Sequence, residues 1–320
     1  MSSANLKHFA AAVGATAIWG TFSIPLRNLK EYPPNEVINY RLGLSLIITW
    51  LIILLFRKDK IRQDISYIKS LSRKNRIKLL KFISLAGLFL TGNWVSFLYA
   101  VNYVNLKSAA FGYMICPLIT AMGGFFLLKE HLSITKLSSI GIALISVFLL
   151  AHGSMLDVLW SIFIAATYSS YLLLQRVIVG LDKLNVLGLQ LILSALVIIP
   201  LSSYFFGTIP PPTATHFWTN ILVVAFLFTV VPLFLVSYSL IGIPSSTLGI
   251  IVYLNPIIAF SIAFLYFEEE INQNQLIAYS LLLASVFLFN WGSISILFDK
   301  QSLTPNFTEG EGLIISDPQT

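Results

Sequence analysis

The segment that decides the fold of this chain occurs twice. Residues Ser108–Glu130 read "SAAFGYMICPLITAMGGFFLLKE", and residues Thr247–Glu269, 139 positions later, read "TLGIIVYLNPIIAFSIAFLYFEE". Each copy is an apolar stretch about one membrane span long, with a proline at its tenth position (Pro117 or Pro256) and a glutamate at its end. Proline removes a backbone hydrogen bond and bends a helix. The repetition therefore predicts two equivalent bent helices in one chain.

The composition is that of a protein embedded in a lipid bilayer. Of the 320 residues, 57% are hydrophobic and 11% are charged, whereas soluble domains carry about 25% charged residues. The single cysteine, Cys116, lies inside an apolar block, so no intrachain disulfide can form. We expect an all-α polytopic membrane protein with about ten transmembrane helices, at residues 9–27, 36–56, 80–104, 108–128, 134–152, 155–177, 185–206, 218–240, 245–267 and 273–297.

The two halves of the chain align with each other. At an offset of 139 residues, or 149 nearer the N-terminus, the matched pairs are Tyr99 and Tyr238, Pro117 and Pro256, Glu130 and Glu269, Trp19 and Tyr168, and Arg27 and Arg176. This alignment predicts two homologous repeats of five spans, residues 8–152 and 155–298, and a polar tail at 299–320 that we expect to be disordered in the cytoplasm. Because five is odd, the second repeat is expected to be inverted in the membrane, as in many alternating-access transporters.

Basic residues predict which way the chain faces. Residues 57–81 contain ten Lys and Arg against two acids, Asp59 and Asp64. Loops rich in Lys and Arg stay in the cytoplasm, so this stretch is predicted to be a cytoplasmic loop with both termini on its side. Of the 20 basic residues, 16 then lie on the cytoplasmic side, and the four in outer positions are Arg27, Lys30, Arg41 and Lys107. The net charge of +6 is therefore a topology signal, and we expect no nucleic acid partner.

Four motifs, read in order, are similar to those of a known transporter family. They are "TGNWVSFLYAVN" (Thr91–Asn102), "GYMICPL" (Gly112–Leu118), "TVVPLFLVSY" (Thr229–Tyr238) and "STLGIIVYLNP" (Ser246–Pro256). The two repeats resemble the EamA domains of the drug/metabolite transporter superfamily, and the motifs resemble its RarD-like branch. The resemblance covers roughly residues 8–298. One departure is Cys116, which stands where an asparagine commonly precedes the proline, whereas Asn255 keeps that asparagine in the second half.

The resemblance implies a function and a place for the site. The implied function is that of a secondary transporter, a permease or exporter, which moves a small organic metabolite or drug across a bacterial inner membrane by alternating access. The central cavity would draw mainly on spans 1, 3, 4, 6, 8 and 9. Aromatic side chains with polar edges suit mostly apolar or ring-bearing solutes, and one arginine in the second span is a candidate to meet an anionic group. The substrate-binding candidates are Trp19, Arg41, Asn93, Trp94, Tyr99, Tyr113, Tyr168, Tyr253 and Asn255, and the candidate gating kinks are Pro117, Pro232 and Pro256.

Each candidate has a structural alternative. Asn93 can join two helices by a hydrogen bond instead of contacting a solute. Arg41 can extend toward the outer interface instead of meeting an anionic group. The prolines can be packing kinks, and some of the aromatic residues can belong to the interfacial belts. Glu130 and Glu269, predicted at opposite membrane faces, are expected to anchor span ends or to form gates.

Several classes of function are disfavoured by the sequence. There is no GxxxxGK[ST] loop for ATP hydrolysis. The four histidines, His8, His131, His152 and His216, lie near predicted span ends without metal-ligand spacing. We therefore expect no enzyme activity, catalytic residue, cofactor or metal. The expected partners are a small-molecule substrate, the lipid bilayer and, as a further candidate, a second copy of the chain. A membrane-embedded scaffold or receptor that binds a ligand without moving it stays as the alternative.

Overall fold

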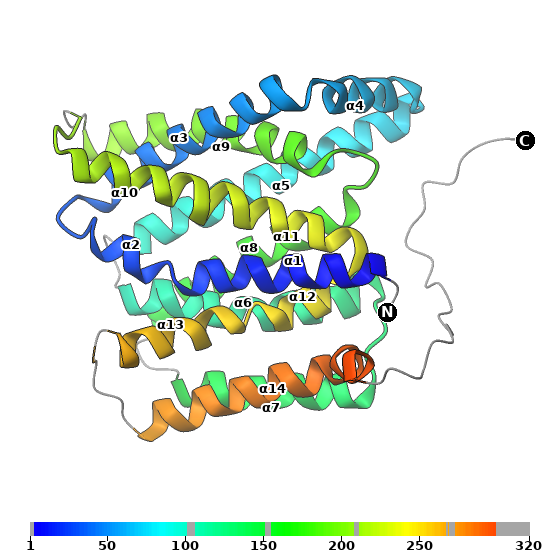
Figure 1. The fold of residues 1–320 in the computed structure, drawn as a ribbon, viewed down its shortest axis with the longest axis vertical. Helices are drawn as coiled ribbons and strands as arrows, with labels where there is room; N and C mark the ends of the chain where they lie inside the picture. Colours follow the sequence, from blue (N-terminus) through cyan, green and yellow to red (C-terminus); the bar gives the residue numbers. More distant parts are fainter. Residues whose placement is uncertain are drawn as a thin grey trace, which may run out of the picture.

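The computed structural model describes residues 3–100, 106–150, 155–207, 211–266, 268 and 273–298. All regular structure in these ranges is helical (Figure 1). Eight helical segments are long and apolar enough to cross a membrane, and two shorter apolar helices, Gly112–Leu128 and Ile134–Leu150, accompany them. These helices confirm the all-α polytopic class. Glu269 and the tail at 299–320 lie outside the described residues.

The helices follow the two predicted halves. Those of the first half are α1 (Ser3–Gly20), α2 (Ser23–Arg27), α3 (Pro34–Phe56), α4 (Lys58–Ser70), α5 (Arg73–Tyr99), α6 (Leu106–Leu128) and α7 (Ile134–Leu150). Those of the second half are α8 (Met155–Val177), α9 (Lys183–Phe206), α10 (Thr215–Ala225), the π-helix η2 (Phe226–Val230), α11 (Val231–Gly242), α12 (Ser245–Ile251), α13 (Leu254–Leu265) and α14 (Gln273–Phe298).

The basic stretch predicted to be a loop is instead helical. It forms α4 and the first turns of α5, which begins at Arg73. The carboxylate of Asp64 on α4 accepts hydrogen bonds from Asp182 N (3.1 Å) and Asn185 Nδ2 (2.7 Å), and Arg57 pairs with the Asp182 carboxylate at 2.6 Å. The prediction missed this helix because its inner face is only partly apolar. The half-buried side chains that recur at helical spacing are Ile61, Asp64, Tyr67 and Ile68.

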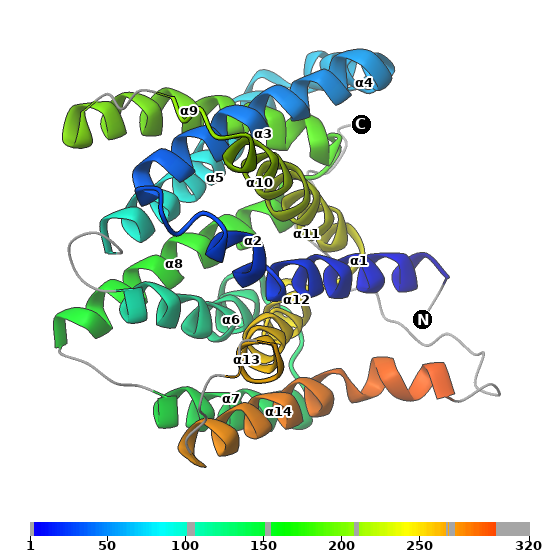
Figure 2. The ribbon, with the colours of Figure 1, turned by 60° about the vertical axis from the view of Figure 1, so that its left-hand side comes forward.

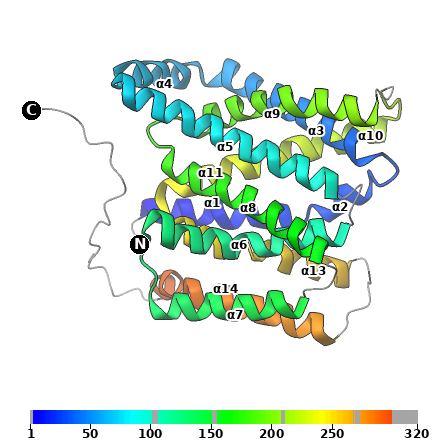
Figure 3. The ribbon, with the colours of Figure 1, turned by 180° about the vertical axis from the view of Figure 1, so that it is seen from behind.

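Each half of the chain places its first long helix against the other half. α1 packs on α11 and α13, and α8 packs on α5 and α6. α7 and α14 lie side by side at one edge of the bundle (Figures 1 and 3), and α3 packs on α9 at the opposite edge. The turned view in Figure 2 shows α1, α6, α8 and α12 between these edges. The central helices are therefore contributed by both halves.

The two repeated segments of the sequence meet in this centre. A Cβ atom added at Gly249 on α12 would lie 2.9 Å from Pro117 O and 3.1 Å from Ala121 N on α6. A Cβ atom at Gly112 on α6 would likewise lie 2.9 Å from Ser161 O on α8. Only glycine allows helix backbones to approach this closely. These glycines bring α6 close to both α12 and α8.

The repeated prolines are not structurally equivalent. Pro117 lies inside the uninterrupted helix α6. Pro256 lies in the first turn of α13, directly after a turn at Val252 and Tyr253 that separates α13 from α12. The segment is therefore interrupted in the second copy only. A pair of gates that act in opposite directions stays a prediction.

Candidate functional site

Arg41 lies at the point where helices from both halves converge. Its Nε atom donates a hydrogen bond to Thr229 Oγ1 at 2.6 Å. Its guanidinium carbon lies 5.3 Å from the centroid of the Phe22 ring and 5.6 Å from that of Trp94, within the range of cation–π attraction. Among the described residues, no carboxylate forms an ion pair with Arg41. Within the part of the chain that the structure describes, the guanidinium is thus held between aromatic faces without a counter-ion.

A proline explains the irregular backbone that Arg41 contacts. Pro232 has no N–H, so it cannot bond the carbonyl four residues earlier, that of Phe228. The helix forms the π-turn η2 just before this proline, and the indole Nε1 of Trp19 donates to Phe228 O at 3.1 Å. Thr229 Oγ1 in turn donates to Val224 O at 2.9 Å. A freed carbonyl inside a membrane protein needs a donor, and Trp19 supplies it from the other half of the chain.

A second layer of aromatic residues is ordered around Asn93. Its Nδ2 donates to Ile164 O at 3.0 Å, and its Oδ1 accepts from the Tyr113 hydroxyl at 3.1 Å. Tyr113 packs edge-on against Tyr168 with ring centroids 6.1 Å apart. Asn93 is therefore an interhelical contact that orients Tyr113, and direct contact with a solute stays a prediction for it.

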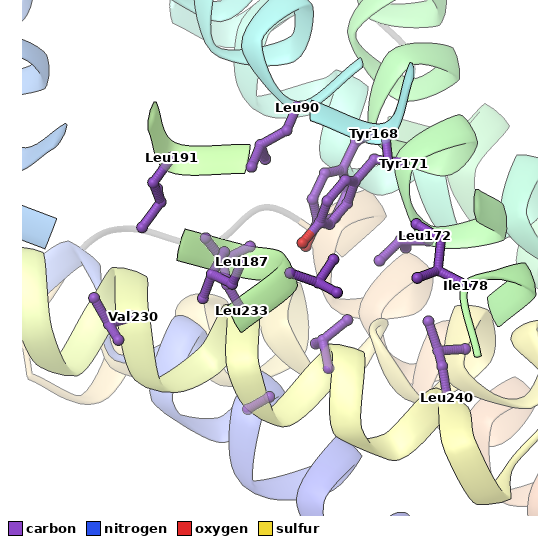
Figure 4. Packing of buried hydrophobic residues seen from close by; sticks show 14 of the residues in the cluster. Leu90, Tyr168, Tyr171, Leu172, Ile178, Leu187, Leu191, Val230, Leu233 and Leu240 are labelled. Atoms are coloured by element: carbon purple, nitrogen blue, oxygen red, sulfur yellow. The ribbon is translucent and has the colours of Figure 1, made fainter. Parts of the chain in front are cut away.

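Tyr168 joins this layer to the rest of the core. It makes an edge contact with Trp19 at 6.2 Å and stacks on Tyr171 at 5.8 Å. Figure 4 shows Tyr168 and Tyr171 side by side among the buried leucines. The Tyr168 hydroxyl is buried and has no hydrogen-bond partner among the described residues. A buried, unpaired hydroxyl is costly, so this atom has an unused capacity to bind a polar group.

The structure brings most, but not all, of the predicted substrate residues together. The residues gathered around Arg41 are Trp19, Asn93, Trp94, Tyr113 and Tyr168. Tyr99 lies apart: it is 45% exposed and stacks on Trp160 at 4.8 Å. Tyr253 packs in a separate cluster with Leu118 and Ile250. Asn255 is half-buried on α13, where its carbonyl approaches Gly20.

Two residues of this site were not predicted. Phe22 follows the end of α1, and Thr229 lies in the π-helix. Thr229 had a signal in the sequence, because it lies three residues before Pro232, where freed backbone carbonyls were expected. Phe22 had none, since an apolar residue near a predicted span end is indistinguishable from its many neighbours.

The departure at Cys116 is accommodated by hydroxyl groups. Cys116 is 1% exposed, and its Sγ lies 3.4 Å from Ser169 Oγ and 3.7 Å from Thr120 Oγ1. Ser169 also donates to Cys116 O at 3.0 Å. The polar contacts that an asparagine could provide at this position are thus partly supplied by α8 and by the next turn of α6.

At one end of the bundle, the carboxylate of Glu130 joins α6 to α12. Its Oε1 accepts from Ser245 N and Ser245 Oγ, both at 2.7 Å, and its Oε2 accepts from Ser246 N at 2.8 Å. Gly124 leaves room for this carboxylate, since a Cβ atom there would clash with Glu130 Oε2. The Glu130 carboxylate therefore closes the seam between the two repeated segments at this end.

A pocket of about 400 Å³ lies elsewhere, on the surface beside α4. It is lined by Lys60, Tyr67 and Lys183 among others. The Lys183 ammonium is already occupied, since it donates to Gln175 O and Ile178 O at the end of α8. None of the residues that line this pocket belongs to the Arg41 group. No group of three or more metal-ligating side chains occurs among the described residues.

Comparison with known proteins agrees with this architecture. The EamA-like transporter family matches residues 7–151 and again 155–291. This chain belongs to that family. Protein RarD of Streptomyces exfoliatus is 27% identical over 288 residues, covering 88% of this chain and 87% of RarD. An uncharacterized transporter of Pseudomonas aeruginosa is also 27% identical, over 91% of this chain and 96% of its own length.

More distant comparisons extend the same result. The uncharacterized transporter YojE of Bacillus subtilis is 26% identical over 87% of this EamA-family chain and 91% of its own length. A solved protein structure with 15% identity superposes with a TM-score of 0.70, covering 92% of this chain and 99% of the other. The relatives support a membrane transporter of the RarD-like type, and the solved structure supports the fold alone.

Proposed function

We propose that this EamA-family chain is a secondary transporter that moves a small organic solute across a bacterial inner membrane by alternating access. The observation that carries the proposal is the group around Arg41. It combines a guanidinium that has no ion pair in the described ranges with aromatic faces in the interior of the bundle, and both halves of the chain contribute to it. Ionisable residues inside membrane spans are costly and usually mark a solute or ion path.

The packing of the helices supports an inverted repeat. Exchanging the two halves turns the contacts of α1 with α11 and α13 into those of α8 with α5 and α6, and both sets are present. Any pseudo-twofold axis between the halves produces this reciprocity, and five spans in each half require that axis to lie in the membrane plane. The difference between the continuous α6 and the interrupted α12–α13 segment suits a protein held in one of two access states.

Counterflow tests transport directly. A deletion strain and its complemented partner are compared by metabolomics, and the solutes whose levels differ are tested with the purified chain in proteoliposomes. A transporter should accumulate labelled solute against a preloaded pool of the same unlabelled solute. A scaffold or receptor would bind the solute but give no counterflow, and that result would overturn the proposal.

Cysteine labelling tests the proposed topology, in which both termini face the cytoplasm. Ser70 on α4 and Glu31 between α2 and α3 are both exposed. In a Cys116→Ser background, an impermeant maleimide applied to intact spheroplasts should label Glu31→Cys and spare Ser70→Cys, because the basic α4 region is held inside. The reverse labelling pattern would contradict the assignment from charge.

A further inference from the structure

We propose that the solute is a monovalent organic anion whose carboxylate binds Arg41 and whose apolar, ring-bearing body packs on the surrounding aromatic residues. This inference rests on the proposed transport function and names the class of its substrate. It follows from the charge of Arg41, from the hydrogen-bonding atoms that have no partner among the described residues, and from the lack of a second charged side chain in the described contacts of Arg41.

The charge of Arg41 has no partner in the described protein. A guanidinium is ionised at every physiological pH. Placing such a charge among helices without a counter-ion is unfavourable, and the rings of Phe22 and Trp94 compensate only part of it. The site is therefore more favourable when an anion from outside the described chain is bound to it.

The donors of Arg41 are arranged for a carboxylate. Arginine carries five N–H groups in a planar fork, and Arg41 uses only Nε in the described structure, toward Thr229 Oγ1. Thr229 Oγ1 is itself fixed by its hydrogen bond to Val224 O. The Nε edge of the guanidinium is therefore held in place by Thr229. The two terminal nitrogens stay available for the bidentate geometry that carboxylates prefer. Tyr168, which packs edge-on against Tyr113, has a buried hydroxyl without a hydrogen-bond partner among the described residues.

The same residues disfavour zwitterions and dianions. An amino acid would also bring an ammonium group, which requires an acid. Glu36, the carboxylate of α3, is five residues before Arg41 and thus about 140° around the helix, and it makes no ion pair with Arg41. Glu130 is already bonded to Ser245 and Ser246. A phosphate dianion would need a second cation, and Arg41 is the one cation in the contacts of this group among the residues that the structure describes.

The body of the solute is inferred from the walls of the site. Flat faces surround the guanidinium on several sides: Phe22 and Trp94 lie within 6 Å of it, and Trp19, Tyr113 and Tyr168 form a connected set of edge contacts. Such walls favour rings and apolar groups over sugars, which need many convergent hydrogen bonds. The competing explanation is that Arg41 only anchors η2 through Thr229.

Matched pairs of probes separate these explanations. The purified full-length chain in nanodiscs is titrated with phenylacetate and phenylacetamide, and with indole-3-acetate and indole-3-acetamide, and thermal stability is followed at each concentration. We expect at least one carboxylate to stabilise the protein saturably, with an affinity about tenfold or more above that of its amide. If neither carboxylate exceeds its amide in the wild-type protein, the inference is overturned.

Two variants assign the preference to Arg41. Arg41→Gln should abolish it, and Arg41→Lys should retain part of it as a point charge without the fork. Lys78→Gln is the matched control, since Lys78 also lies over a ring, that of Phe82 at 5.7 Å, but on the exposed part of α5. A carboxylate preference that survives in Arg41→Gln, or is lost equally in Lys78→Gln, would also overturn the inference.

A chemical measurement on the wild-type protein covers the case in which Arg41→Gln does not fold. Phenylglyoxal modifies arginine, and mass spectrometry reports the modification of Arg41. The stabilising carboxylate should protect Arg41 and its amide should not, whereas equal protection by both would count against the inference. Counterflow distinguishes the two proposals: transport of a neutral solute that Arg41→Gln leaves unchanged rejects only the anion, and carboxylate binding without counterflow rejects only transport.

Discussion

Replacing Glu130 by glutamine is expected to open the end of the bundle where α6 meets α12. The carboxylate accepts three hydrogen bonds, from Ser245 N, Ser245 Oγ and Ser246 N, at 2.7–2.8 Å. Hydrogen bonds to charged groups contribute about 1.5–3 kcal/mol each, and glutamine keeps one acceptor but loses the charge and the second. A loss of about 2 kcal/mol corresponds to a roughly 30-fold rise in the population with an open seam.

A shielded cysteine reports this opening. Thr247 is 7% exposed and directly follows Ser246. In a Cys116→Ser background, Thr247→Cys should react slowly with an impermeant maleimide in inside-out vesicles, and about 30-fold faster once Glu130→Gln is added. Asp59→Asn is the control, because it removes an exposed carboxylate of α4, paired with Arg62 at 3.5 Å on the surface. Equal rates of maleimide reaction in the Glu130→Gln and Asp59→Asn proteins would contradict the prediction that Glu130 holds α6 and α12 together.

Replacing Gly249 by alanine is expected to separate the two repeated segments. The added Cβ would lie 2.9 Å from Pro117 O and 3.1 Å from Ala121 N, and backbone atoms inside a packed helix cannot move aside cheaply. Overpacking of this kind costs about 1–3 kcal/mol. We therefore expect Gly249→Ala to lower the free energy of unfolding by that amount and to slow solute counterflow, because α6 and α12 form part of the central contact.

A matched glycine elsewhere isolates the steric effect. Gly141 lies inside α7, and no heavy atom lies within 4 Å of a Cβ built there. Gly141→Ala should leave unfolding unchanged or raise its free energy by up to about 1 kcal/mol, since alanine is the better helix former. Unfolding in increasing dodecyl sulfate measures both variants. If Gly249→Ala is as stable as Gly141→Ala, the close approach of α6 and α12 does not carry the expected strain.

The site shows how far residue types alone can lead. Arg41 was predicted as a candidate because a charge is rare and costly inside a span, and aromatic residues because their flat faces suit ring-bearing solutes. Tyr99 and Tyr113 were both predicted to bind the substrate, because each is an aromatic residue with a polar edge in an apolar span. In the structure, Tyr99 stacks on Trp160 at the surface, whereas the Tyr113 hydroxyl donates a hydrogen bond to Asn93. The sequence does not distinguish them, because which side of a helix faces the interior depends on its neighbours when every side of the helix is apolar.

At Pro232 the sequence predicts a freed carbonyl, but the donor that pairs with this carbonyl is identified only by the structure. A proline inside a span was expected to free a carbonyl that must find a donor. The donor is Trp19 Nε1, 209 positions away in the chain, and the break takes the form of the π-helix that presents Thr229 to Arg41. No local sequence pattern predicts the pairing of Trp19 with this carbonyl, because the pairing depends on how α1 packs against η2 and α11.

The class of this protein is predictable from residue types alone, because apolar blocks of span length, few charges and a repeated proline-bearing segment indicate a helical membrane protein of two repeats. Those properties follow from hydrocarbon as a solvent, which acts on each segment independently. The packed structure adds that the repeated segments touch at Gly249, that Glu130 joins them, and that Arg41 lies among aromatic rings with no counter-ion among the described residues. Those are properties of packing between distant segments, and packing depends on the shape of every neighbour at once.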